Sequence, residues 1–479
     1  MMQSKLSRSA LCFPALFLVL AWLSMQMAAQ DAHKTWRLDY FHTGGPGLEA
    51  FSLDRVVVEP LAWPGHPSGN IEPRETGVYR FEIRDTSNHL LLFSRGYSSI
   101  FGEWTSTLEA GDFNRTFHES LRFPAPAGPV EVVINKRDPK GIFHQVWRTV
   151  VDPKSIFIDR ASPPKQAVVE IERNGDPSEK VDILLLGDGY TAKERGKFVK
   201  DARRLTETLF RTEPFKSRRK DINVWALCPP SAESGVSRPS TGVYRTTPIG
   251  ATYDVFGSER YVLTMENRAM REIACWAPYE FVEILVNNET YGGGGIYNLF
   301  STVAAGNDWA NYIFVHEFGH HMAGLADEYY TSPVAYQPPS EIVEPWEPNV
   351  TATTERGMIK WKDLIGATTP LPTPWPKEEF ETFSRGIQER RRQIRAERRP
   401  ESVMSALFRE EQEHEMKLFG AAPFASAIGA FQGANYDAKA FYRPQVDCIM
   451  FTRNEVPFCA ACNRALSEVM DWVTGKKAR

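Results

Sequence analysis

Short runs of β-forming residues dominate residues 31–160, and Gly, Pro, Asn and Asp separate one run from the next. Apolar and polar side chains alternate in runs such as Val78–Ile83 and Gln145–Val150, which is the pattern of a strand with one buried face. Residues 31–160 are therefore expected to form an all-β sandwich. No catalytic constellation occurs in this region, so it is interpreted as a structural or binding module.

The pattern changes after residues 152–166, a proline-containing segment that is interpreted as a linker. Val181–Leu186 is a continuous apolar run, typical of a strand buried on both faces. A capping box follows it and predicts a helix over Ala192–Phe210. Strand-like and helix-like segments then alternate, which predicts an α/β domain over residues 165–479.

Residues 377–420 are rich in Glu and Arg and favour helix, and Pro400 divides them. They are expected to form a solvated helical hairpin inserted in the second domain. Acidic side chains are interspersed among the basic ones, and the whole chain carries a net charge of −4. Nucleic acid is therefore excluded as an expected partner.

The N-terminus has the order of a secretory signal peptide. Lys5 and Arg8 precede the apolar run Ala10–Leu23, and small residues follow up to Ala29. Residues 1–29 are expected to be removed, which predicts an exported protein: periplasmic, cell-surface or secreted. A retained membrane anchor is the alternative, but the run is short for a bilayer span, and no other stretch is suited to one.

His316, Glu317 and His320 form a His-Glu-x-x-His motif. Two histidines four residues apart project from one face of a helix, so one Zn²⁺ ion can bind both imidazoles. Glu317 stands where it can take a proton from a metal-activated water that attacks a carbonyl. For the five residues alone, a buried amphipathic helix with two satisfied histidines is the alternative interpretation.

A third ligand is expected just beyond this helix. Gly324 permits a sharp turn, and Asp327 follows as the expected ligand, with Glu328 as the alternative. Helix, glycine turn and third ligand is the order found in metzincin peptidases, although here the turn is one residue longer than usual. His321 points about 100° away from His320 and is not expected to bind the metal.

Other segments suggest parts of the same site. The glycine run in Tyr291–Val303 predicts either a strand at the rim of the site that pairs with an extended peptide or an ordinary strand with a hinge. Met450 is expected in a tight turn below the metal. Tyr442 and Arg443 are candidate donors to the substrate carbonyl.

Five cysteines remain after signal-peptide removal, and two of them form the motif Cys459-Ala-Ala-Cys462. A zinc ribbon needs a second such pair, and the sequence contains none. A disulfide bridge or buried thiols are therefore expected at this motif, with at least one thiol left over in the mature chain.

With these segments in place, the chain resembles the IgA-peptidase family of zinc metallopeptidases, the igalysin branch of the metzincins. The matching segments are Gly187–Thr191, Tyr291–Tyr297, His316–His320, Ala323–Tyr329, Tyr442–Pro444, Cys448–Met450 and Phe458–Cys462. The resemblance implies a β-rich N-terminal domain followed by an α/β metzincin-like zinc peptidase domain. It also implies that His316, His320 and Asp327 bind one catalytic Zn²⁺. Glu317 would then be the general base, and Met450 would lie beneath the metal.

The function predicted from the sequence is that of an exported zinc-dependent endopeptidase acting on a protein or peptide substrate. Cleavage of IgA itself rests on the resemblance alone. The alternative is a non-catalytic surface protein that binds glycan or protein and carries a degenerate peptidase domain, although Glu317 and both histidines are intact. A third hypothesis is a gluzincin, whose glutamate ligand would lie among the acids after Glu378.

Overall fold

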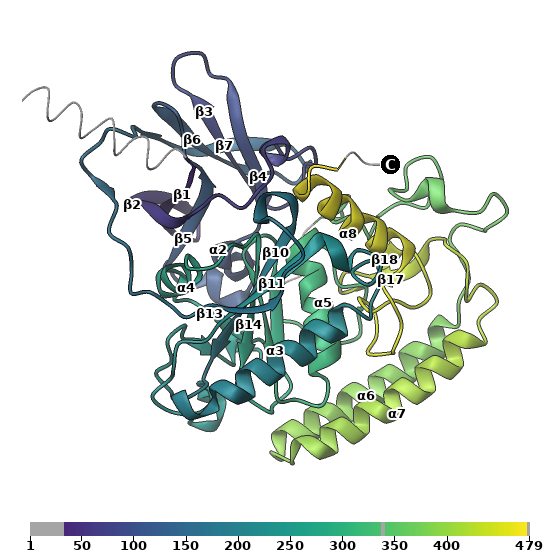
Figure 1. Ribbon diagram of the computed structural model, residues 1–479. Coiled ribbons are helices and arrows are strands. Elements are labelled where there is room, and N and C mark those ends of the chain that lie inside the picture. Colours follow the sequence, from purple (N-terminus) through teal and green to yellow (C-terminus); the bar gives the residue numbers. More distant parts are fainter. Residues whose placement is uncertain (1–32, 337–340, 477–479) are drawn as a thin grey trace, which may run out of the picture.

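The computed structural model describes residues 33–336 and 341–476 (Figure 1). The predicted signal peptide, residues 1–29, lies outside this part of the chain. Within it, no helix combines the length and the apolar character needed to cross a membrane. The chain forms two regions, an N-terminal one built mainly of β-sheet and a larger one in which helices cover a mixed sheet.

The N-terminal region contains two four-stranded sheets. The first has the order β5 (Arg115–Pro124), β1 (Lys34–Gly45), β2 (Leu48–Ala62) and β8 (Ile158–Asp159). The second has the order β4 (Leu91–Tyr97), β3 (Tyr79–Asp85), β6 (Val130–Arg137) and β7 (Phe143–Val151). Side chains two apart point to the same face of a strand. Leu38 and Tyr40 of β1 thus share one buried cluster with Val132 and Ile134 of β6.

The larger region is built on a six-stranded sheet. Its order is β15 (Gly293–Ile296), β16 (Phe300–Ala304), β14 (Phe281–Val286), β10 (Val181–Asp188), β11 (Ile222–Leu227) and β9 (Val169–Glu172). The inner strands are parallel, and both edge strands run antiparallel to their neighbours. Every residue of β10 is buried, which confirms the prediction of a strand covered on both faces.

Helices α3 (Arg195–Leu209), α5 (Ala310–Ala323) and α8 (Ala460–Val473) pack on one face of this sheet. The other face is covered by α2 (Ile100–Thr105), α4 (Asn267–Ala274) and the short strands β12 (Ala251–Thr252) and β13 (Leu263–Thr264). The helix predicted over Ala192–Phe210 is observed as a 3₁₀ turn, Ala192–Glu194, that leads into α3.

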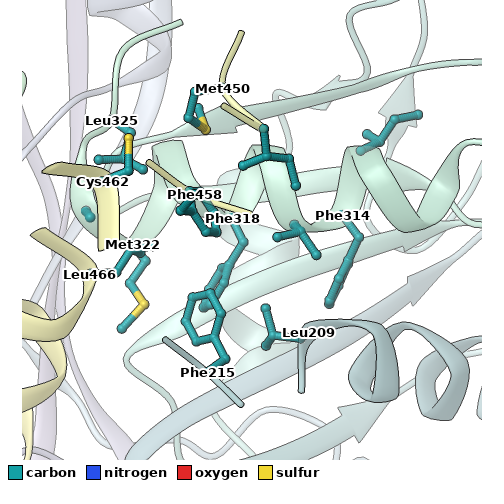
Figure 2. Close-up of a cluster of buried hydrophobic side chains, with 14 of the residues drawn as sticks. Leu209, Phe215, Phe314, Phe318, Met322, Leu325, Met450, Phe458, Cys462 and Leu466 are labelled. Atoms are coloured by element: carbon teal, nitrogen blue, oxygen red, sulfur yellow. The ribbon is translucent and has the colours of Figure 1, made fainter. Parts of the chain in front are cut away.

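Helix α5 lies in the centre of the larger core. Phe314, Phe318 and Met322 recur every four residues along it and pack into one cluster with Leu209 of α3 and Leu466 of α8 (Figure 2). This buried face fixes the rotation of the helix about its axis. The side that carries His316 and His320 therefore points away from this cluster.

Helices α6 (Lys377–Ala396) and α7 (Glu401–Gly420) form the predicted hairpin and lie along one side of the molecule (Figure 1). The hairpin is not solvated on all sides, because Phe380, Ile387, Met404 and Phe408 join the core of the larger region. These residues are spaced as one helical face would require. The hairpin β17 (Phe431–Ala434) and β18 (Asp437–Arg443) follows it.

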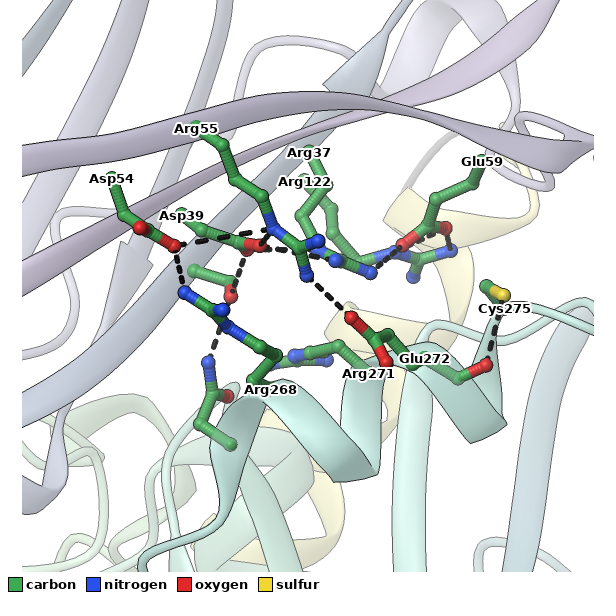
Figure 3. Close-up of polar contacts among 12 residues, drawn as sticks. Arg37, Asp39, Asp54, Arg55, Glu59, Arg122, Arg268, Arg271, Glu272 and Cys275 are labelled. Atoms are coloured by element: carbon green, nitrogen blue, oxygen red, sulfur yellow. Dashed lines mark hydrogen bonds and ion pairs between the residues drawn. The ribbon is translucent and has the colours of Figure 1, made fainter. Parts of the chain in front are cut away.

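Charged side chains join the two regions where α4 lies against β1, β2 and β5 (Figure 3). Arg55 donates to Glu272 of α4 over 2.6 Å, and Arg268 of α4 pairs with Asp54. Buried Asp39 accepts hydrogen bonds from Arg37 at 2.8 Å and from Arg55 at 2.9 Å. The N-terminal region is thus held against the larger one by a connected ion-pair network.

Candidate metal centre and active site

The structure brings three of the predicted site residues to one point. On α5, the Nε2 atoms of His316 and His320 lie 3.2 Å apart. The Oδ1 atom of Asp327 lies 3.1 Å from the first and 3.3 Å from the second. The three atoms therefore form a nearly equilateral triangle.

The triangle has the size that a tetrahedral metal requires. Zinc–nitrogen and zinc–oxygen bonds of about 2.1 Å place two tetrahedral ligands about 3.4 Å apart. Asp327 is 6 % exposed, and within the described chain its Oδ1 atom has no hydrogen-bond partner. A buried carboxylate oxygen without a partner is costly, and a cation at the centre of the triangle would satisfy it. The three residues therefore fit a metal ion such as Zn²⁺.

Hydrogen bonds behind the three side chains fix their orientation. The Nδ1 atom of His316 lies 2.9 Å from the carbonyl oxygen of Ile449, and Nδ1 of His320 contacts the carbonyl oxygen of Leu325. A carbonyl can only accept, so the proton is on Nδ1 and the Nε2 lone pair faces the triangle. Oδ2 of Asp327 accepts a hydrogen bond of 2.5 Å from the Tyr436 hydroxyl.

Gly324 sends the chain from α5 toward the third ligand. It ends the helix with φ 61° and ψ 38°, a left-handed conformation that glycine adopts without strain. Asp327 then meets the histidines, whereas the Glu328 carboxylate lies 3.4 Å from the Cys462 sulfur. The structure thus places Asp327, and not its alternative Glu328, beside the histidines.

His321 forms hydrogen bonds with two strands of the six-stranded sheet. Its Nδ1 atom contacts the carbonyl of Ile296 at 3.1 Å, and its Nε2 accepts from the backbone N–H of Val282 at 3.0 Å. The side chain therefore ties α5 to β15 and β14, away from the three candidate ligands, as its position in the helix predicts.

Met450 lies in the predicted turn and packs against α5, the helix that carries both histidines. Its backbone carbonyl accepts from the Glu328 N–H at 2.8 Å, and its side chain is fully buried. A Cβ atom on Gly319 would lie 3.0 Å from the Met450 sulfur. The methionine can pack against this turn of the helix because residue 319 is a glycine.

A cavity of about 550 Å³ opens over the candidate metal ligands. Glu317 lies in its wall, and burial raises the pKa of this carboxyl above its ordinary value, although His316 and His320 act in the opposite direction. The cavity is also lined by β15, by Glu103 of α2 and by the inner faces of α6 and α7. Both the N-terminal region and the inserted hairpin thus contribute to it.

The glycines of β15 allow this strand to lie against α5. A Cβ atom on Gly293 would lie 2.5 Å from Ile313, and one on Gly295 would lie 2.4 Å from the Glu317 carbonyl oxygen. The run therefore serves close packing, and the strand is an edge strand at the rim of the cavity. Its outer edge is partly covered, because Gly293 exchanges backbone hydrogen bonds with Arg260 and Val262.

The proposed role of Arg443 as a donor to substrate is wrong. Arg443 is fully buried and donates to the carbonyls of Gly433 at 2.7 Å and Val446 at 3.0 Å, while its guanidinium stacks on Phe451. These contacts within the protein give Arg443 a structural role. Tyr442, whose backbone pairs with Thr351, is not among the residues that line the cavity.

Sequence reasoning missed several groups in the cavity. Arg260 lines it and donates to the Tyr329 hydroxyl at 2.9 Å, and Tyr436 contacts Asp327 from the β17–β18 turn. Asn435 and Tyr436 both have positive φ, 49° and 64°. No motif marks Arg260 or Tyr436, because each reaches the site from a distant part of the chain. Of these three residues, Tyr329 alone lies close to the candidate ligand Asp327 in the sequence.

Two family models match the chain. Residues 169–470 match the model described as IgA Peptidase M64, and residues 28–148 match the one described as Peptidase M64 N-terminus. These matches place the chain in the class of peptidases. The first match covers more than half of the chain, so the protein belongs to the IgA peptidase M64 family. A comparison with curated proteins finds no match.

Proposed function

We propose that this protein is an exported zinc-dependent endopeptidase, with a metzincin-like catalytic domain behind an N-terminal β-sandwich. The observation that carries the proposal is the triangle of His316, His320 and Asp327 at 3.1–3.3 Å on the wall of a cavity. All three side chains line the cavity, so the fourth position of a tetrahedral ion would face it, as is typical of catalytic zinc sites.

When bound, Zn²⁺ would supply Lewis acidity to the attacking water and to the scissile carbonyl. Glu317 accepts the proton of that water and returns it to the leaving amine. Arg260, half-buried in the cavity wall, would supply a positive charge to stabilise the negative charge that develops on the substrate oxygen.

The substrate is a protein or peptide, as membership of a peptidase family supports. An extended segment can lie along β15 beyond Gly293, where the strand edge borders the cavity. Glu103 of α2 and the inner face of the α6–α7 hairpin would contact the residues on either side of the cleaved bond. IgA is a candidate substrate only through the family's name.

Replacement of the proposed base tests the mechanism. Glu317→Gln keeps the shape of the side chain but cannot accept a proton, so cleavage of a mixed peptide library should fall by about 10²–10⁴-fold. Zinc content, measured by elemental analysis, should stay at the wild-type value. Glu413→Gln, on the exposed face of α7, is the matched control and should cleave normally. Undiminished cleavage by Glu317→Gln would refute the mechanism.

Export is tested separately. The mature protein, recovered from outside the cytoplasm of a cell that expresses the full chain, should begin at residue 30 or 31 when its N-terminus is sequenced. An N-terminus that still contains the apolar run Ala10–Leu23 would indicate a retained anchor.

A further inference from the structure

A second group of metal-ligand side chains lies behind the active-site helix. Glu328, Cys448, Cys459 and Cys462 are all buried, and their donor atoms lie within 4.8 Å of one another. They come from three separate segments: the chain after α5, the turn that carries Met450, and the first turn of α8.

Their distances match those around a single tetrahedral ion. The Glu328 Oε1 atom lies 3.4 Å from the Cys462 sulfur and 3.6 Å from the Cys459 sulfur. The sulfurs of Cys448 and Cys462 are 4.0 Å apart. Zinc bonds of about 2.3 Å to sulfur and 2.1 Å to oxygen predict S···O distances of about 3.6 Å and S···S distances of about 3.8 Å.

Backbone N–H groups are directed at these sulfurs. Cys448 accepts from the N–H of Cys459 at 3.2 Å and from that of Met450 at 3.5 Å. Cys459 is the N-cap of α8 and accepts from the Cys462 N–H at 3.5 Å. Donors of this kind and a helix N-terminus stabilise thiolates, the form in which cysteine binds metal.

Glu328 supplies an independent observation. Its side chain is fully buried, and Oε1 accepts from Asn349 at 3.0 Å. Within the described chain its Oε2 atom has no hydrogen-bond partner. A buried carboxylate is rarely left without full compensation in a protein core, and an ion bound at this carboxylate would neutralise its charge.

We propose that Glu328, Cys448, Cys459 and Cys462 bind a second, structural Zn²⁺ ion. Protein atoms would occupy all four coordination positions of the ion, as in structural zinc sites. Cys459 and Cys462 supply one pair of ligands. The other two ligands, Glu328 and Cys448, are far apart in the sequence and do not form a second Cys-x-x-Cys motif. The fold brings them to the first pair. The ion would fix the chain on both sides of Met450 and directly after Asp327.

Metal content of the full chain tests this inference without reference to peptidase activity. The wild type should hold two zinc ions, and the double variant His316→Ala/His320→Ala should keep one. Cys462→Ser should lose the second ion, whereas Cys275→Ser, a buried cysteine of the interface with the N-terminal region, should keep both. One ion in the wild type and none in the histidine variant would overturn the proposal.

Cobalt substitution keeps the test valid if Cys462→Ser fails to fold. Co²⁺ in the histidine variant should show the strong near-ultraviolet absorption of thiolate-to-metal charge transfer, because all its cysteines are intact. Absence of that band would refute thiolate ligation. A disulfide is tested by alkylation in denaturant and chelator without reductant. All three cysteines of the cluster should be modified, and protection of any two would overturn the proposal.

Discussion

The two carboxylate oxygens of Asp327 have different partners. Oδ1 faces the histidines, while Oδ2 accepts the Tyr436 hydroxyl at 2.5 Å. A hydrogen bond to a metal-binding carboxylate orients it and limits its motion. Tyr436 would therefore act on the metal through Asp327 and without binding it.

Tyr436→Phe should consequently weaken metal binding by about 10–100-fold, because it removes this hydrogen bond and keeps the ring. Competition with a chromophoric chelator measures the affinity. Tyr244→Phe, at an exposed position, is the matched control and should leave the affinity unchanged. If Tyr436→Phe also bound metal normally, the hydroxyl would have no part in orienting Asp327.

Among individual residues, the sequence predicted those site residues that lie close to one another along the chain. His316, Glu317, His320 and Asp327 lie within twelve residues, so helix periodicity and one glycine turn bring them together. Tyr436 is 109 residues from Asp327, and no local rule predicts that contact.

The element on which the site depends is α5, which is packed closely on the sides that do not face the cavity. Gly295 of β15 approaches it from the cavity rim, and Met450 packs against Gly319. The parallel strand β10 was predictable because burial on both faces leaves an unbroken apolar run. The inner face of the α6–α7 hairpin was missed, because frequent charges concealed Phe380, Ile387 and Met404 at helical spacing.

Gly319→Ala should destabilise the protein by about 1–3 kcal/mol through overpacking. Its Cβ atom would come within 3.0 Å of both the Met450 sulfur and the Phe458 ring. The midpoint of urea unfolding measures the change. Gly386→Ala in α6 is the control: a Cβ there meets nothing within 4 Å, and the better helix propensity of alanine should raise the midpoint. Equal midpoints for the two variants would contradict the packing argument.

In the molecule as a whole, the N-terminal region is joined to the larger region by the network around Asp39. Burial raises the pKa of this carboxyl, but the charge and hydrogen bonds of Arg37 and a hydrogen bond from Ser120 lower it more, and the net shift is downward. A carboxyl whose pKa is lowered by folding stabilises the folded state above its unfolded pKa, about 3.9, and loses that contribution as pH falls through its folded pKa.

The melting temperature of the wild type should therefore fall as pH drops below about 4. Asp39→Asn should be less stable at neutral pH and should show a weaker dependence on acid. Asp112→Asn, at an exposed position, should follow the wild type. Scanning calorimetry over a pH series measures all three, and an Asp39→Asn profile parallel to the wild type would exclude Asp39 as a source of the acid sensitivity.

Consecutive residues after α5 face opposite sides of the chain: Asp327 meets the histidines, and Glu328 meets the cysteines. A deletion of one residue between Gly324 and Asp327 would place Glu328 beside the histidines, and an insertion would place Asp327 beside the cysteines. In either case one group would receive the other group's carboxylate and the other would receive none, so a single-residue change in length would damage both groups at once. Related chains should therefore tolerate substitutions in this segment far more readily than changes in its length.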